Sequence, residues 1–305
     1  RRQRQMCIRD RVYAELGTTS GTTIVEGDIA SVKANESSWQ NSCNDAAIVV
    51  LSRAGGESTD AAMKTEEGRN YLALSSQEED LMSYLKQQKE AGVFGSIIVL
   101  VNSEQAMELG WLDEYDVDAC LVVGRPGAVG YTGIVNVLTG AANPSGRLVD
   151  TYASNSLSAP ATVFAGENTQ TWANLDWVEN NDVDFGTDGS ENNWIVYAEG
   201  IYVGYKYYET RYEDTVLKAG NADSTKGSST GNAWNYADEV SFTFGDGLSY
   251  TTFEQKLDQV KYNAETDSYE AEVTVTNTGD VAGRDVVEFY ACLLYTSPSP
   301  RDGAT

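Results

Sequence analysis

Three short runs of consecutive, mostly β-branched apolar residues constrain the fold more than any other feature. They are Ala46–Leu51, Ser96–Val101 and Ala119–Val123. Strands of this kind are buried on both faces, which is typical of a parallel sheet. Helix-forming segments separate the runs, so strands and helices alternate along the chain. The pattern predicts an α/β fold: an α/β/α sandwich with a mainly parallel sheet.

The longest predicted helix follows the first strand and its loop. It begins at Ser75–Ser76, which form two overlapping capping boxes with Glu78–Glu79. Gly92 predicts where this helix ends. Shorter helical segments are predicted around Gln105–Leu109 and over Tyr131–Leu138.

An acidic, aromatic segment interrupts the α/β pattern. No lysine or arginine occurs between Arg147 and Lys206, and tryptophans that include Trp172 and Trp177 are interspersed with acidic and amide residues. One interpretation is a surface insertion over about 153–195 whose aromatic rings pack on the sheet domain. The other is part of a sugar-binding rim, because tryptophan faces stack on pyranose C–H surfaces and carboxylates accept hydrogen bonds from hydroxyl groups.

The pattern changes again toward the end of the chain. Residues 219–235 are rich in Gly, Ser, Thr and Asn, which predicts a mobile loop. Polar and apolar residues alternate from Lys256 onward, and strands are predicted at Glu270–Thr276 and Asp285–Tyr290 with a turn at Asn277–Asp280. About three strands are present of a sandwich that normally has about seven. The α/β domain is therefore followed by an incomplete β-sandwich.

The two ends differ in composition from the rest. Residues 1–11 contain five arginines and one acid, whereas residues 293–305 pass into Ser-Pro repeats. Both ends resemble translated sequencing-adapter sequence more than ordinary disordered arms. We expect residues 1–11 and 293–305 to make few contacts with the body. Because both ends look truncated, no compartment is assigned.

Composition excludes several classes of function. The chain has 305 residues, a net charge of −25 and no histidine. The negative charge repels nucleic acids and anionic membranes, and no apolar run approaches the roughly 18 residues of a membrane span. Without histidine, Ser-His-Asp and Cys-His catalysis and histidine-ligated zinc are excluded, and we predict no metal or other cofactor. Proton chemistry must rest on carboxylates, lysine, tyrosine or cysteine.

The loop after the first strand carries the candidate catalytic group. Gly55-Gly56-Glu57 follows the strand directly, which puts Glu57 at the edge where open parallel sheets bind ligands. Nucleotide binding there is a poor alternative, because the loop has no P-loop or GxGxxG pattern and offers a carboxylate where a phosphate needs N–H donors. From the pattern alone, a solvated surface glutamate is the plainer interpretation.

Five segments together carry a family resemblance. They are Ile48–Asp60, Asn143–Leu148 (NPSGRL), Glu199–Tyr208 (EGIYVGYKYY), Phe244–Thr251 (FGDGLSYT) and Val275–Gly283 (VTNTGDVAG). In this order they resemble glycoside hydrolase family 3, the β-glucosidase family. The first four resemble its α/β sandwich domain, and the last resembles the opening of the fibronectin type III-like domain that follows it.

The resemblance implies a division of the chain. The expected parts are an arm at 1–11, the α/β sandwich domain at 12–253, a truncated fibronectin type III-like domain at 254–291 and a tail at 292–305. It also implies a nucleophilic aspartate on a (β/α)8 barrel, for which this sequence has neither the eight repeats nor the motif. The chain therefore looks like a piece of a longer enzyme.

The resemblance also implies a reaction and its residues. The expected reaction is retaining hydrolysis of a β-linked gluco-oligosaccharide or an aryl-β-glucoside, with Glu57 as general acid/base. Asp60 is the second choice as proton donor, and Arg53 is a possible partner that orients the loop. Asp60, Arg53, Trp172 and Trp177 are the expected substrate-binding residues. We expect the isolated chain to be inactive, because retaining hydrolysis requires two carboxyl groups.

A second hypothesis remains open beside the first. The chain could be a non-catalytic carbohydrate-binding or interaction module that works through its aromatic, acidic insertion. A neighbouring barrel with the nucleophile motif in the parent gene would favour the enzyme.

Overall fold

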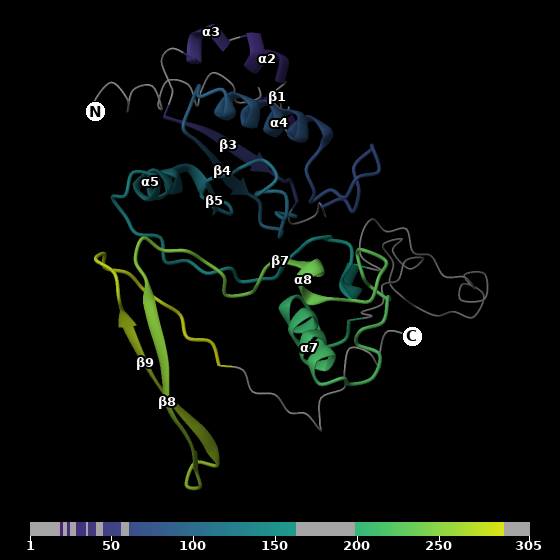
Figure 1. Ribbon diagram of the computed structural model, residues 1–305, viewed down its shortest axis with the longest axis vertical. Helices are drawn as coiled ribbons and strands as arrows, with labels where there is room; N and C mark the ends of the chain where they lie inside the picture. Colours follow the sequence, from purple (N-terminus) through teal and green to yellow (C-terminus); the bar gives the residue numbers. More distant parts are fainter. Residues whose placement is uncertain are drawn as a thin grey trace, which may run out of the picture. The chain divides into compact units, whose positions relative to one another are not determined.

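The computed structural model describes residues 19–20, 23–24, 29–34, 36–40, 45–55, 61–162 and 199–289 (Figure 1). The chain divides into two compact units, one of residues 1–125 with 153–197 and the other of residues 126–152 with 198–305. The division at 125–126 falls inside the segment predicted as one α/β domain. Among the described residues, no helix has both the length and the apolar character needed to cross a membrane.

A three-stranded parallel sheet forms the centre of the first unit. Its strands β3 (Ala46–Ser52), β4 (Ser96–Asn102) and β5 (Ala119–Val122) are hydrogen-bonded in that order. Ile97, Val99 and Val101 are fully buried in the central strand, where each apolar side chain contributes about 1.5–3 kcal/mol to folding. The parallel α/β fold predicted from the apolar runs is confirmed, and the strand bounds agree to within one residue.

Helix α4 (Ser76–Glu90) runs along one face of this sheet (Figure 1). Ser75 caps it through the predicted capping box: its side chain accepts a hydrogen bond from the Glu78 N–H, and the Glu78 carboxylate accepts one from the Ser75 N–H. The helix ends at Glu90 with Ala91 as its C-cap, and Gly92 follows with a φ of +73° that disfavours any side chain there. Met82 and Leu85 are buried and contribute to the core.

Short elements precede the sheet. They are β1 (Thr19–Ser20), β2 (Thr23–Ile24), α2 (Ile29–Ala34) and α3 (Glu36–Trp39). α2 and α3 meet the outer side of α4 through Tyr84, whose ring contacts Trp39 edge-on at 6.4 Å and lies 5.1 Å from Lys33 Nζ.

Among the described residues, two predicted elements do not form, the helix at 105–109 and the strand at 285–290 as far as residue 289. Residues 105–109 form a loop rather than a short helix, because the Ser103 hydroxyl accepts a hydrogen bond from the Gln105 N–H and donates one to the Gln105 carbonyl. Such side-chain bonds compete with helical ones. Residues 285–289 form no strand, and the Asp285 side chain instead bonds to Arg147 and Gln255.

The second unit contains the remaining larger elements. They are α5 (Gly127–Leu138), α7 (Tyr205–Val216), α8 (Tyr236–Glu239), β7 (Val240–Phe242) and the antiparallel hairpin of β8 (Phe253–Asn263) and β9 (Ser268–Asn277). Strand β6 (Tyr152–Ala153) lies at the boundary of the units, and a 3-10 turn covers Pro160–Thr162. α5 begins four residues before its predicted start. β9 confirms the strand predicted at 270–276.

Residues 219–235, predicted as a mobile loop, are tied to α7. Arg211 on α7 donates hydrogen bonds to the carbonyls of Ala222 and Ser224, at 2.8 and 3.1 Å, and its guanidinium lies 4.7 Å from the Trp234 ring centre. Trp234 is only 2% exposed. The buried carboxylate of Glu239 accepts hydrogen bonds from the Ser229 N–H. A buried arginine therefore organises a segment whose composition alone indicates a loop.

Three of the five family-like segments meet in the second unit. The Asn143 side chain donates to the Ala282 carbonyl at 3.0 Å and accepts from the Ser249 hydroxyl and the Tyr250 N–H at 2.9 and 2.7 Å. Arg147 donates to Asp285 at 2.7 Å and to the Gly247 carbonyl. These motif residues therefore have a structural role, because they join the segment after the hairpin to the body of this unit.

Asp285 should make this junction sensitive to acid. Hydrogen bonds from Gln255 and Arg147 lower the pKa of Asp285 from its ordinary value of 3.8. The group therefore stabilises the fold fully above pH 3.8 and loses this contribution as the pH falls through its lower folded pKa. We expect Asp285→Asn to lower the Tm at pH 7, and we expect the difference from the unchanged chain to disappear in acid. Asp280→Asn, at an exposed position, is the control. A Tm difference for Asp285→Asn that does not shrink as the pH is lowered below 3.8 would contradict this account.

Candidate active site at the carboxyl edge of the sheet

The carboxyl ends of β3 and β4 meet at one edge of the parallel sheet. Ser52 and Asn102 are register partners, and the Asn102 amide donates to the Ser52 hydroxyl at 3.3 Å. The Arg53 N–H continues the ladder to the Asn102 carbonyl at 3.4 Å. The chain leaves β3 here, three residues before the segment 56–60 that carries Glu57.

The first residue after β3 is Arg53, and its own side chain holds it in place. Its Nε donates to the Tyr71 carbonyl at 2.7 Å, and its two terminal nitrogens donate to the carbonyls of Ser52 and Ala73 at 2.9 and 2.6 Å. The same nitrogens bind both carboxylate oxygens of Glu78, at 2.8 and 2.6 Å. The side chain is only 6% exposed. These five bonds use all five N–H donors of the guanidinium.

Tyr71 fixes the next residue. Its hydroxyl donates to the Ala54 carbonyl and accepts from the Ala54 N–H, both at 2.9 Å. The Tyr71 ring centre also lies 5.8 Å from the Arg53 guanidinium carbon. One side chain therefore satisfies both backbone groups of Ala54, so this residue needs no strand partner.

Gly55 is held by close packing. A Cβ added there would lie 2.7 Å from Gln105 Nε2 and 3.2 Å from the Ala61 Cβ, so a larger residue would require the Gln105 side chain to move. The Gly55 carbonyl accepts a hydrogen bond from Arg125, which follows β5 and pairs with Glu104 at 3.1 Å. The contact with Ala61 also shows that the residues flanking segment 56–60 lie side by side.

Among the predicted site residues, the structure describes Arg53 alone. Glu57 and Asp60 lie in segment 56–60, and Trp172 and Trp177 lie in segment 163–198, outside the described residues. All five N–H donors of Arg53 bond within the protein. Its predicted roles, as a sugar contact and as a partner that orients the loop, stay predictions. Among the described residues, no group of three or more acidic or cysteine side chains could hold a metal ion.

Sequence reasoning missed three residues of this edge: Tyr71, Gln105 and Arg125. Tyr71 and Arg125 are 18 and 72 residues after Arg53 in the sequence, and neither lies in a motif with a recognisable spacing. The one signal in the sequence is that Arg125 follows an apolar strand. Because the carboxyl ends of parallel strands meet at one edge, this position indicates that Arg125 lies near the loop after β3.

Comparisons with known proteins agree on one family. The family model described as glycosyl hydrolase family 3 C-terminal domain matches residues 9–205. A β-glucosidase of Ruminococcus albus is 29% identical over 247 residues, which cover 81% of this chain and 20% of that protein. β-Glucosidase B of Emericella nidulans is 33% identical over 187 residues, which cover 61% of this chain and 17% of that protein.

Solved structures show the same relationship. β-Glucosidase 3B of Thermotoga neapolitana, in complex with α-D-glucose, aligns with a TM-score of 0.52 and 28% identity over 77% of this chain and 26% of that one. A β-glucosidase of Paenibacillus barengoltzii aligns with a TM-score of 0.55 and 26% identity over 87% of this chain and 22% of that one. The chain therefore spans between 17% and 26% of the length of these four proteins.

The resemblance to glycoside hydrolase family 3 is confirmed by these matches. The fibronectin type III-like resemblance of residues 275–283 stays a prediction. The matched region contains the parallel sheet, its carboxyl edge and the Arg53–Tyr71 contacts. The chain belongs to glycoside hydrolase family 3, and residues 9–205 correspond to the C-terminal domain of that family.

Proposed function

We propose that this chain supplies the general acid/base, Glu57, and part of the sugar pocket to a retaining β-glucosidase-type hydrolase. The observation that carries the proposal is the clamp formed by Arg53, Tyr71 and Gly55 at the carboxyl edge of the sheet. This clamp holds the backbone up to two residues before Glu57 and brings Gly55 beside Ala61. A catalytic group requires such a rigid base, because small displacements of a proton donor lower its rate strongly.

The proposed substrate is a β-linked gluco-oligosaccharide or an aryl-β-glucoside. In the first step, Glu57 donates its proton to the glycosidic oxygen while a nucleophilic carboxylate bonds to the anomeric carbon and the aglycone leaves. In the second step, the Glu57 carboxylate removes a proton from water, which displaces the enzyme carboxylate and releases the sugar with retained configuration. Retaining hydrolysis places the two carboxyl groups about 5–5.5 Å apart.

The nucleophile is proposed to lie on a (β/α)8 barrel in the same parent protein. Glu57 must be protonated to act first as an acid, and closure of the barrel over the sheet edge would raise its pKa by removing water. The similarity to β-glucosidases several times longer than this chain supports the barrel partner.

The isolated chain should therefore not hydrolyse aryl-β-glucosides. The expected result is release of 4-nitrophenol from 4-nitrophenyl-β-glucoside at the rate of the buffer blank, from a chain whose circular dichroism shows folded helix and sheet. The physical reason is that one of the two required carboxyl groups is missing. Glu57-dependent turnover by the purified chain would contradict the proposal and would indicate a nucleophile within it.

A further inference from the structure

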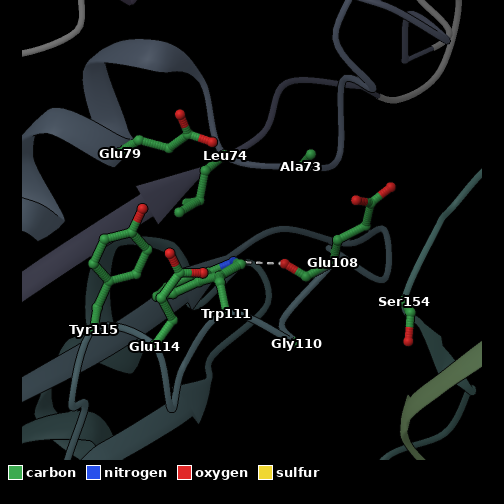
Figure 2. A pocket seen from close by; sticks show the side chains of 9 residues that line it. All are labelled: Ala73, Leu74, Glu79, Glu108, Gly110, Trp111, Glu114, Tyr115 and Ser154. Atoms are coloured by element: carbon green, nitrogen blue, oxygen red, sulfur yellow. Dashed lines mark hydrogen bonds between the residues drawn. The ribbon is translucent and has the colours of Figure 1, made fainter. Parts of the chain in front are cut away.

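A groove in the first unit has no part in the proposed chemistry. It runs between α4 and the turn at 108–115 and consists of two adjoining depressions of about 420 and 250 Å³, which share Glu114 and Tyr115. Figure 2 shows the larger depression, with Leu74 on one side and Trp111 on the other. We call this feature the α4 groove. Because the two depressions adjoin, the groove suits a linear ligand better than a compact one.

An aromatic pair forms one wall of the α4 groove. The Trp111 N–H donates to the Glu108 carbonyl at 2.7 Å, which fixes the indole (Figure 2). The Tyr115 ring meets the indole edge-on, with centres 5.9 Å apart. Burial, followed by the charge of Glu114, raises the pKa of Tyr115, so its hydroxyl stays protonated at neutral pH. A fixed aromatic wall opposite Leu74 suits a ligand with a flat apolar face.

Carboxylates surround this apolar centre, and the protein holds two of them in place. One oxygen of Glu108 accepts hydrogen bonds from the Asn70 amide and from the N–H and hydroxyl of Ser156, at 2.8–2.9 Å. Glu79 is paired with Arg69 at 2.6 Å. A carboxylate has about four lone-pair sites, so both groups can still accept hydrogen bonds from a ligand. The groove therefore fits a ligand that combines apolar faces with many O–H donors.

Cations of the protein already lie at the α4 groove. Arg69 neutralises Glu79, and Lys86, which lines the smaller depression, donates to the Glu114 carbonyl at 2.8 Å. These two cations offset part of the charge of the four lining carboxylates, Glu79, Glu90, Glu108 and Glu114. The remaining carboxylate oxygens suit an uncharged ligand that donates many O–H hydrogen bonds. Carbohydrates combine O–H donors with apolar C–H faces.

We propose that the α4 groove binds a β-linked gluco-oligosaccharide, stacked on Trp111 and hydrogen-bonded to Glu108 and Glu114. The choice of sugar rests on the proposed function, whereas the groove itself does not. The groove would hold a glucan chain on the surface of this domain without hydrolysing it.

Calorimetric titration of the full 305-residue chain with cellotetraose tests the proposal. Saturable binding is expected, and Trp111→Ala should weaken it about tenfold, the effect of losing an aromatic platform. Trp111→Phe should retain part of the affinity. Tyr269→Ala, which removes a 79% exposed ring on β9, should leave the affinity unchanged and serves as the control. If Trp111→Ala lowers the Tm, the exposed Glu114→Gln replaces it, with an expected loss of about threefold.

Three outcomes would overturn the groove proposal: no binding of cellotetraose, affinity unchanged by these substitutions, or Trp111-dependent binding of tetralysine instead. The groove proposal and the proposed function can fail independently of each other. If cellotetraose does not bind the chain but hydrolysis by the parent depends on Glu57, only the groove proposal fails. If cellotetraose binding depends on Trp111 but hydrolysis by the parent does not depend on Glu57, only the acid/base assignment fails.

Discussion

Replacing Glu57 with alanine in a barrel-containing parent should lower the turnover of cellobiose about 10²–10⁴-fold, the usual contribution of one acid/base group. The glucose leaving group of cellobiose is poor and needs a proton at its oxygen. An aryl-β-glucoside with a strongly acidic phenol needs no such proton, so its first step should be nearly unchanged. The kcat for cellobiose checks the first expectation, and the burst of 2,4-dinitrophenol, which measures the first step on 2,4-dinitrophenyl-β-glucoside alone, checks the second.

Two controls make this test specific. Glu66→Ala removes an exposed carboxylate a few residues beyond the loop and should leave cellobiose turnover unchanged. Asp60→Ala tests whether Asp60, the second choice as proton donor, carries the acid/base role instead. Cellobiose turnover that survives Glu57→Ala but falls with Asp60→Ala would transfer the acid/base role to Asp60.

Arg53→Ala should give the largest loss of stability of any single substitution at this edge, about 3–5 kcal/mol in the free energy of unfolding. It removes five hydrogen bonds and leaves the Glu78 carboxylate, whose side chain is 11% exposed, without its cation. Arg53→Lys keeps the charge but not the planar fork, and its loss should be intermediate. Urea unfolding of the unchanged chain and of both variants measures these losses on one scale.

The neighbouring ion pair is a matched control. Arg69 pairs with Glu79 in the same first turn of α4, also at 2.6 Å, but both side chains are about two-fifths exposed. Water screens this pair, so Arg69→Ala should barely change the urea midpoint. Equal losses for Arg53→Ala and Arg69→Ala would contradict the role given to burial at Arg53.

The sequence predicts the sheet and α4 well because local chemistry determines both. Continuous apolar runs can only be buried strands at this length, and Ser75 with Glu78 forms its capping box whatever lies elsewhere in the chain. The loop at 105–109 was predicted as a helix because the backbone bonds of the Ser103 hydroxyl leave no periodic pattern in the sequence.

The clamp could not be predicted, because its contacts join residues far apart in sequence. Nothing in the spacing of Arg53, Tyr71 and Gln105 indicates that Arg53 binds Tyr71, that Tyr71 binds Ala54, or that Gln105 lies beside Gly55. The sequence offered Arg53 both as a sugar contact and as a partner for the loop. Only the three-dimensional arrangement shows that its donors are all used within the protein.

The acid/base role of Glu57 can be tested most directly by trapping the glycosyl-enzyme with azide. In the Glu57→Ala parent, the nucleophile should still form its covalent intermediate from 2,4-dinitrophenyl-β-glucoside, but no base remains to activate water. Added azide needs no base, so it should restore turnover and yield β-glucosyl azide, identified by NMR of the product. The unchanged parent and Glu66→Ala should release glucose alone. Glucose as the sole product from Glu57→Ala, at a rate that azide does not alter, would contradict the assignment of Glu57.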